Sequence, residues 1–150
     1  MSDIVLLMHR IIFHLGQWRI PLLPNLMNKL FIRLLFGCQL GVGTKIGNNV
    51  NLGYGGLGIV IHENAVIGNN VRIGTNTTIG GTMNNSKVPI VGDNTIISTG
   101  AKILGPTRVG RNCVIGANAV VMNNIPDNCV VVGVPAKIIK NNINIGDYRN

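Results

Sequence analysis

His62 is the single histidine between residues 40 and 139 of this 150-residue chain, and its side chain is the one best suited to move a proton. A neutral imidazole accepts protons near neutral pH, so His62 is a candidate general base. It stands where most neighbouring units of the sequence carry glycine. A histidine fits a tight turn less well than glycine does, which suggests that this histidine is present for its chemistry. The alternative is a surface histidine at a corner. His9 and His14 lie in an apolar N-terminal segment, where we expect packing or interface roles.

A six-residue period runs through residues 40 to 126 around this histidine. The period fits neither a helix nor a simple two-faced strand, but it fits a coil of short strands with a turn every six residues. Three units close one triangular coil, and coils must stack to bury their apolar side chains. The sequence therefore predicts an all-β parallel β-helix of four to five coils over residues 40–139. Its inward-pointing aliphatic positions are Leu40, Ile46, Leu52, Ile61, Ile67, Ile73, Ile79, Val91, Ile97, Ile103, Val109, Ile115 and Val121.

Two interruptions of the period flank His62. The step from Leu52 to Ile61 is three residues too long, and the step from Ile79 to Val91 is six too long. Extra residues in a stacked coil must loop outward, and such loops commonly carry binding and catalysis. Either loop alone is equally well explained as a tolerated insertion, but their position beside His62 favours function.

The segments outside the period differ in kind. Residues 1–39 predict two apolar helices, one through about Leu15 and one over residues 26–36, with basic side chains at Arg10, Lys29 and Arg33. We expect them to cap the open end of the β-helix and to pack on sister subunits. The alternative is peripheral contact with an anionic membrane face, since neither run is long enough to span a bilayer. Residues 140–150 predict a polar, loosely ordered tail.

The formal net charge is +8, and 4% of the residues are aromatic. The basic residues come without an aromatic RNA-binding platform or a DNA-reading helix, so an anionic small molecule suits the chain better than nucleic acid. A solvated basic surface explains most of these charges equally well. Three cysteines without metal-ligand spacing indicate a reducing, cytoplasmic compartment, with the inner face of the membrane as an alternative site.

Four stretches resemble the hexapeptide-repeat acyltransferases, and within them the serine acetyltransferase-like group. They are GLGIVIHENAVIGNNVRIGTNTTIGGT (56–82), VGDNTIISTGAKILGPTRVG (91–110), IGANAVV (115–121) and VVGVPAKII (131–139). The resemblance implies a left-handed coil, a homotrimer with active sites in clefts between adjacent β-helices, and acetyl-CoA as the acyl donor along the groove. It implies no metal.

The same resemblance implies which residues contact the donor. Lys102 and Lys137 are the expected partners of its phosphates. For each glycine, corner geometry is an equally simple explanation. The matched positions are Gly80, Gly81, Thr82, Gly100, Ala101, Gly116, Ala117, Pro135 and Lys137.

Acetyl transfer to a hydroxyl needs a base, a donor for the oxyanion and two oriented substrates. We expect His62 to be the base, and Tyr54 to orient the acceptor or to hold the oxyanion. Glu63 and Asp93 are the carboxylates considered as partners of His62, and Glu63 is disfavoured because neighbours on a strand point apart. Neither Cys113 nor Cys129 is expected to act as a nucleophile, so transfer is expected to be direct.

The acceptor predicted is a sugar hydroxyl of a surface polysaccharide or its precursor. Serine acetyltransferases carry an Asp-His pair where this chain has Tyr54 or Gly55, and a second histidine where it has Val88. They also carry a large N-terminal helical domain, and those that dock into cysteine synthase end in Ile, where this chain has Asn150.

Three alternatives stand beside the sugar. They are L-serine as the acceptor, a non-catalytic relative that binds CoA or acts as a scaffold, and a metal enzyme of the γ-carbonic anhydrase type. The last needs three histidine ligands from the β-helices of its trimer, and one histidine per repeat region does not furnish them.

Overall fold

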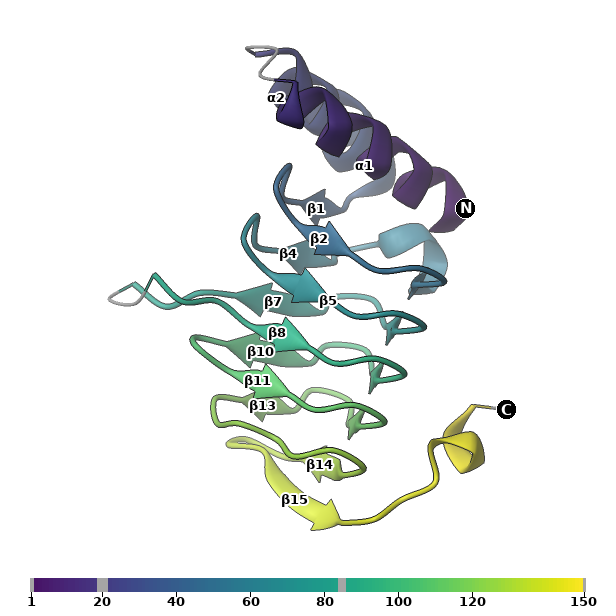
Figure 1. Ribbon diagram of the computed structural model, residues 1–150, viewed down its shortest axis with the longest axis vertical. Helices are drawn as coiled ribbons and strands as arrows, with labels where there is room; N and C mark the ends of the chain where they lie inside the picture. The colour runs from purple at the N-terminus through teal and green to yellow at the C-terminus, as the bar shows by residue number, and fades with distance from the viewer. Residues whose placement is uncertain (1, 19–21, 84–85, 150) are drawn as a thin grey trace.

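A column of stacked coils makes up most of the molecule, with two helices across one end (Figure 1). The computed structural model describes residues 2–18, 22–83 and 86–149. The coils form three sheets of parallel strands, to which the last strand, β15, is added antiparallel. Sheet A contains β1 (Gln39–Leu40), β4 (Val60–Ile61), β7 (Thr78–Gly80), β10 (Lys102–Leu104) and β13 (Val120–Val121). Sheet B contains β2 (Lys45–Ile46), β5 (Val66–Ile67), β8 (Ile90–Val91) and β11 (Arg108–Val109). Sheet C contains β3 (Asn51–Leu52), β6 (Arg72–Ile73), β9 (Ile96–Ile97), β12 (Val114–Ile115), β14 (Val130–Val132) and β15 (Lys137–Lys140).

The β-helix is left-handed, as expected. In Figure 1 the near strands β5, β8 and β11 point to the right while the chain descends from coil to coil. Each coil runs from sheet A to sheet B to sheet C, which creates three columns of corners. We call them the A–B, B–C and C–A corners, after the sheets they join.

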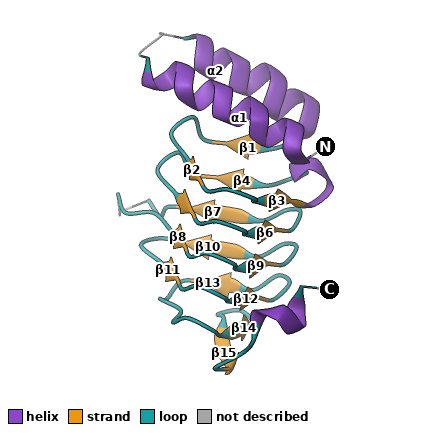
Figure 2. Ribbon diagram, turned by 45° about the vertical axis from the view of Figure 1, so that its right-hand side comes forward, coloured by secondary structure: helices purple, strands orange, loops and turns teal. Residues whose placement is uncertain are grey.

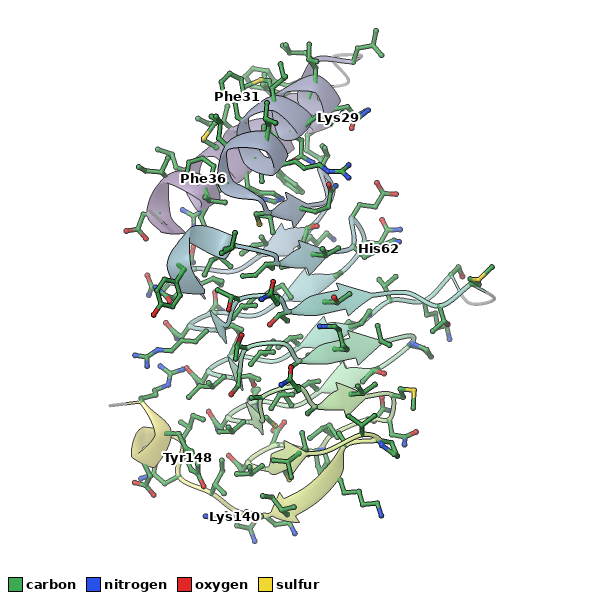
Figure 3. The ribbon with its side chains drawn as sticks, turned by 180° about the vertical axis from the view of Figure 1, so that it is seen from behind. Lys29, Phe31, Phe36, His62, Lys140 and Tyr148 are labelled. Atoms are coloured by element: carbon green, nitrogen blue, oxygen red, sulfur yellow. The ribbon has the colours of Figure 1, made fainter. Side chains whose placement is uncertain are left out.

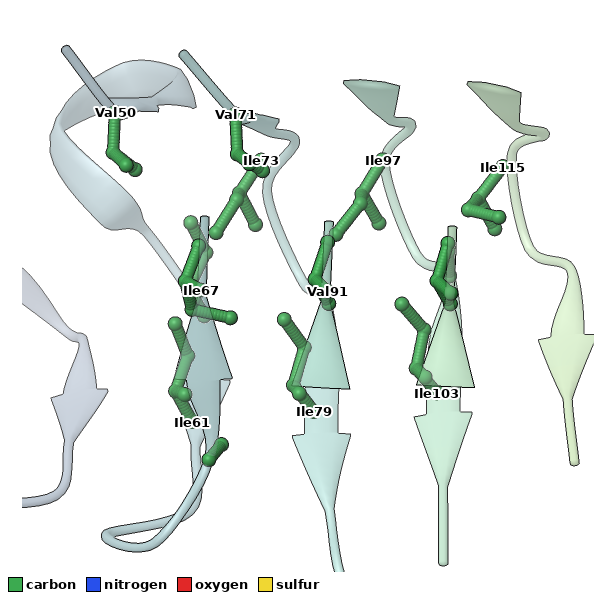
Figure 4. Close-up of a cluster of buried hydrophobic side chains, with 14 of the residues drawn as sticks. Val50, Ile61, Ile67, Val71, Ile73, Ile79, Val91, Ile97, Ile103 and Ile115 are labelled. Atoms are coloured by element: carbon green, nitrogen blue, oxygen red, sulfur yellow. The ribbon is translucent and has the colours of Figure 1, made fainter. Parts of the chain in front are cut away.

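The core is built from the periodic aliphatic residues, which the sequence predicted to point inward. All of them are buried except Ile46, which is half-buried and packs against the others. Because the strands pair in parallel register, equivalent residues of successive coils lie above one another. Ile61, Ile79 and Ile103 form one column, and Ile73, Ile97 and Ile115 form another (Figure 4). Burying one aliphatic side chain of this size stabilises the folded state by roughly 1.5–3 kcal/mol relative to leaving it exposed.

The B–C corners are held by a ladder of asparagine side chains. Asn49, Asn70, Asn94, Asn112 and Asn128 all have left-handed backbone angles, which asparagine tolerates better than most residues. Each amide nitrogen donates to the next amide oxygen at 2.9 to 3.3 Å. The turn residues therefore satisfy one another from coil to coil and fix the stacking distance.

The N-terminal helices lie across the first coil (Figure 2). They are α1 (Ser2–Gln17), α2 (Leu23–Met27) and a π-helix (Asn28–Leu34) that continues α2. The second predicted helix thus begins three residues earlier than expected and changes its winding midway. Two buried polar side chains bond to the first coil: Asn28 Nδ2 donates to Leu40 O at 2.8 Å, and His9 Nε2 lies 3.0 Å from Gly41 O. His9 is buried as expected, whereas His14 is exposed.

The C-terminal segment is not the loosely ordered tail predicted. Strand β15 turns back antiparallel to β14, and the chain then climbs along sheet C to a 3-10 helix at Ile145–Tyr148. Ile143 N donates to Asn128 O at 3.0 Å, and Arg149 Nη2 donates to Asn70 O at 2.8 Å. The prediction failed because a polar sequence does not reveal a contact between residues 79 positions apart.

Candidate active site

His62 occupies the A–B corner that directly follows β4. Its backbone is held from both sides, because its N–H donates to Ile79 O at 2.9 Å and its carbonyl accepts from Thr44 Oγ1 at 3.0 Å. The ring is half-buried, and its Nδ1 accepts the N–H of Asn64 at 3.1 Å. A backbone N–H can only donate, so the neutral ring carries its proton on Nε2. His62 therefore presents an N–H to whatever lies outside the corner.

The longer of the two insertions begins next to His62. It occupies the A–B corner of the following coil, between β7 and β8, and projects away from the column (Figure 1). Figure 3 shows His62 just above the base of this projection. Met83, near its tip, is fully exposed. The histidine and the projecting loop therefore lie on the same edge of sheet A, in successive coils.

Tyr54 lies in the shorter insertion, at the C–A corner that precedes β4. Its backbone has φ 48°, and its side chain is 87% exposed, while Gly55 and Gly56 beside it are buried. Strand β4 separates it from His62, so the two predicted catalytic residues sit at opposite edges of sheet A. A single chain does not bring them together.

The residues predicted to contact the donor gather on sheet A and the corners along its edges. Gly80 ends β7, and Gly81 and Thr82 begin the projecting loop at the A–B edge. Gly105, which the sequence analysis missed, packs against this group: its N–H donates to Gly80 O at 2.9 Å, and it lies next to the Thr82 side chain. Its left-handed φ of 73° could not be read from the sequence.

At the C–A edge the predicted residues differ in what they can offer. Gly100 has φ 73°, and a Cβ there would collide with the side chain of Asn118 in the next coil. Ala101 is fully buried, so only its backbone is available to a ligand. Gly116 is half-buried and Ala117 is exposed. The equivalent corner position carries Asn76 and Asn118 in the neighbouring coils, so Gly100 makes room for the Asn118 side chain.

Lys102 lies on sheet A between these two edges. Its Nζ donates to Asn76 O and to Gly100 O, both at 2.8 Å. An ammonium has three hydrogens, so one donor remains for an anionic group. Asn76 was missed by the sequence analysis, because a backbone carbonyl carries no sequence signal.

The last predicted pair lies at the bottom of the same face. Gly133 O accepts from Val120 N at 3.0 Å and Ala136 N donates to Val120 O at 2.8 Å, which holds the turn containing Pro135 beside β13. Pro135 and Lys137 are both exposed. The predicted donor contacts therefore form one stripe down sheet A and its two edges, from β7 to the turn beside β13, except Lys137, which begins β15 on sheet C.

Other reactive groups do not join this stripe. Cys113 and Cys129 are buried, and burial raises the pKa of both thiols, which disfavours the nucleophilic thiolate. Asp93 Oδ1 accepts from Asn69 N at 2.6 Å on a B–C corner, away from His62 in the same chain. Within the described ranges, no group of three or more His, Cys, Asp or Glu side chains is placed to hold a metal ion.

Known proteins share this repeat and this architecture. The family described as bacterial transferase hexapeptide (six repeats) matches residues 89–123. The serine acetyltransferase of Synechococcus elongatus is 37% identical over 136 residues, which is 89% of this chain and 55% of that protein. A solved serine acetyltransferase in complex with CoA superposes with a TM-score of 0.86 at 33% identity, over 93% of this chain and 57% of that one. The solved serine acetyltransferase of Neisseria gonorrhoeae in complex with serine superposes with a TM-score of 0.85 at 32% identity, over 91% of this chain and 55% of that one.

The fold and the repeat are those of the hexapeptide-repeat acyltransferases, and the chain is similar to the serine acetyltransferases among them. The chain spans about half the length of the relatives it matches.

Proposed function

We propose that this chain transfers an acetyl group from acetyl-CoA to the hydroxyl of L-serine. The observation that carries the proposal is the stripe on sheet A, where the glycines at the projecting loop and the free donor of Lys102 match the donor-contacting positions of the family. The similarity to serine acetyltransferases, including complexes with CoA and with serine, supports the same donor and acceptor.

This proposal reverses the preference for a sugar that the sequence favoured. The relatives fit the alternative, serine, better than the sugar. A sugar hydroxyl stays the second candidate because of one feature, the exposed ring of Tyr54. An exposed aromatic side chain offers a flat apolar surface with a polar tip, which suits a large, partly apolar ring better than a small amino acid.

In the proposed step, the acceptor oxygen attacks the thioester carbonyl carbon as its proton passes to a base. The tetrahedral intermediate collapses, the C–S bond breaks, and the CoA thiolate leaves and regains a proton. His62 is the proposed base. To accept a proton at Nε2, the neutral ring must move its own proton to Nδ1, which breaks the bond from Asn64 at a cost of about 1 kcal/mol. In the tautomer described above, Nε2–H would instead donate to the oxyanion.

A site that holds both His62 and Tyr54 needs two copies of the chain, because the residues lie at opposite edges of sheet A. We therefore propose a homotrimer in which the C–A corner of one copy faces the A–B corner of the next. Acetyl-CoA is an intracellular metabolite, so the proposed reaction belongs to the cytoplasm.

The test is release of free CoA thiol from acetyl-CoA by the purified chain. Turnover with L-serine, and none with D-serine or with nucleotide sugars, is the expected result. Turnover only with a sugar would replace serine by the second candidate. If CoA binds by calorimetry but no acceptor is turned over, the chain is a CoA-binding relative and the catalytic proposal is wrong.

A further inference from the structure

The outer face of the N-terminal helices is apolar and uncovered. Helix α1 has apolar residues on more than one side: Val5 and Ile12 are buried, whereas Ile4 and Ile11, seven residues apart on one face of the helix, are exposed, and Leu7 is exposed beside Asn49 and Val50 of the first coil. Large exposed apolar patches on a soluble protein commonly mark interaction sites. The exposed large apolar side chains of this layer are Ile4, Leu7, Ile11, Trp18, Leu22, Leu23, Leu26, Leu30, Phe31, Leu34 and Leu35.

The charges around this face are almost all of one sign. Lys29 and Arg33 are exposed on the same helices, whereas Arg10 is exposed on the side nearer the β-helix, where its Nη2 donates to Asn48 Oδ1 at 3.4 Å. Asp3 is the one acidic residue in the first 62 positions of the sequence. Figure 3 shows Lys29 and Phe31 on this layer, at the end of the molecule opposite Tyr148. The face is therefore apolar and basic, and it lies at the opposite end of the column from β15.

This combination distinguishes between two occupants. If a second copy docked on the face, two sets of Lys29 and Arg33 would meet with little acidic charge to compensate them, and like charges at close range repel. An anionic lipid surface supplies the opposite charge and accepts the apolar side chains at the boundary between headgroups and acyl chains.

We propose that the N-terminal helical layer docks in the plane of an anionic membrane surface, with the β-helix standing away from it. The stripe on sheet A runs along the side of the column, so docking at the end leaves it accessible. No helix in the described parts of the chain is long and apolar enough to cross a bilayer, and docking in the interface does not need one. The proposal is independent of the acetyl acceptor, because it concerns a different surface.

Trp18 provides the first readout. It is the single tryptophan of the chain and is 75% exposed on this layer. Tryptophan prefers the bilayer interface, and its emission shifts to shorter wavelength when it leaves water. We expect this shift when the full chain meets vesicles containing phosphatidylglycerol, and not with pure phosphatidylcholine. The shift should weaken as salt is raised from 50 to 500 mM, because salt screens surface charge.

Matched pairs of variants distinguish an effect of charge on this face from a general effect of the substitutions on folding. Each basic residue near an anionic surface contributes roughly a fivefold gain in binding, so Lys29→Glu with Arg33→Glu should lower vesicle binding in flotation by at least about 25-fold. Arg108→Glu with Lys137→Glu makes the same change of charge on exposed residues of the β-helix and should leave binding within about twofold. Ile11→Ser with Leu34→Ser should abolish the Trp18 shift, while Met122→Ser with Ile139→Ser should not.

Two results would overturn the proposal. One is equal binding of the charge variants and the unmodified chain to anionic vesicles. The other is a Trp18 shift that appears without lipid, depends on protein concentration and is accompanied by a doubled mass in light scattering, which would assign the face to self-association.

Discussion

The backbone N–H of Asn64 donates to Nδ1 of His62 over 3.1 Å, and this bond sets which ring nitrogen carries the proton. The ring then presents an N–H at Nε2, which is the arrangement of a hydrogen-bond donor and needs a tautomer change to become a base.

Two substitutions at His62 test its role. His62→Ala should lower kcat by about 10²–10⁴-fold, as expected for loss of a general base. His62→Gln keeps an amide donor but cannot accept a proton, so it should be as inactive as the alanine variant if His62 is the base. Recovery of most activity in the glutamine variant would assign the donor role instead. His14→Gln, on an exposed helix position, is the control and should keep the parental rate.

Lys102 should matter more for binding acetyl-CoA than for the chemical step. Lys102→Met removes a charged donor, and charged hydrogen bonds contribute about 1.5–3 kcal/mol, so KM for acetyl-CoA should rise at least about tenfold while kcat changes little. Lys45→Met changes an exposed lysine on sheet B and should change neither constant. An unchanged KM in Lys102→Met would mean that the lysine serves only to join the carbonyls of Asn76 and Gly100.

Alanine substitutions at two glycines of the sheet A stripe should distinguish an effect on stability from an effect on CoA binding. Gly100→Ala puts a Cβ into the side chain of Asn118 at a left-handed φ, so it should lower the free energy of unfolding by about 1–3 kcal/mol in urea titrations. Gly80→Ala meets its nearest neighbour only at 3.7 Å and should keep its stability. Reduced CoA affinity in Gly80→Ala at unchanged stability would link that glycine to the donor. Equal loss of stability in both variants would contradict the assignment.

Stability should fall with acid because of His9. Burial is the larger influence on its pKa and lowers it below 6.5, while the hydrogen bond with Gly41 opposes the shift. The unfolded state therefore binds the proton more readily, and stability should be lost as the pH falls below about 6.5. The urea midpoint of the parent should drop between pH 7.5 and 5.5, and that of His9→Gln should drop less. The same drop in both would assign the acid sensitivity to other groups.

The sequence alone predicted the β-helix, because the six-residue period marks the side chains that point inward. In parallel register these side chains lie above one another in successive coils. The resemblance also named the residues of the sheet A stripe, and their contact with the donor stays a prediction. The sequence did not reveal that Tyr54 and His62 lie at opposite edges of sheet A, since the inserted residues between Leu52 and Ile61 follow no period. It missed Gly105 and Asn76 because their contributions come from backbone geometry. The return of Arg149 to Asn70 depends on a contact between distant residues that no local pattern encodes.

The two ends of the column have a consequence for assembly. Parallel strands with matching register could in principle go on adding coils, and an unpaired edge is a template for another chain. At one end Asn28 and His9 bond to the carbonyls of Leu40 and Gly41, and at the other β15 runs antiparallel against β14. Both ends are thereby blocked to head-to-tail polymerisation, which keeps a repetitive stack at finite length and prevents it from becoming the seed of a fibre.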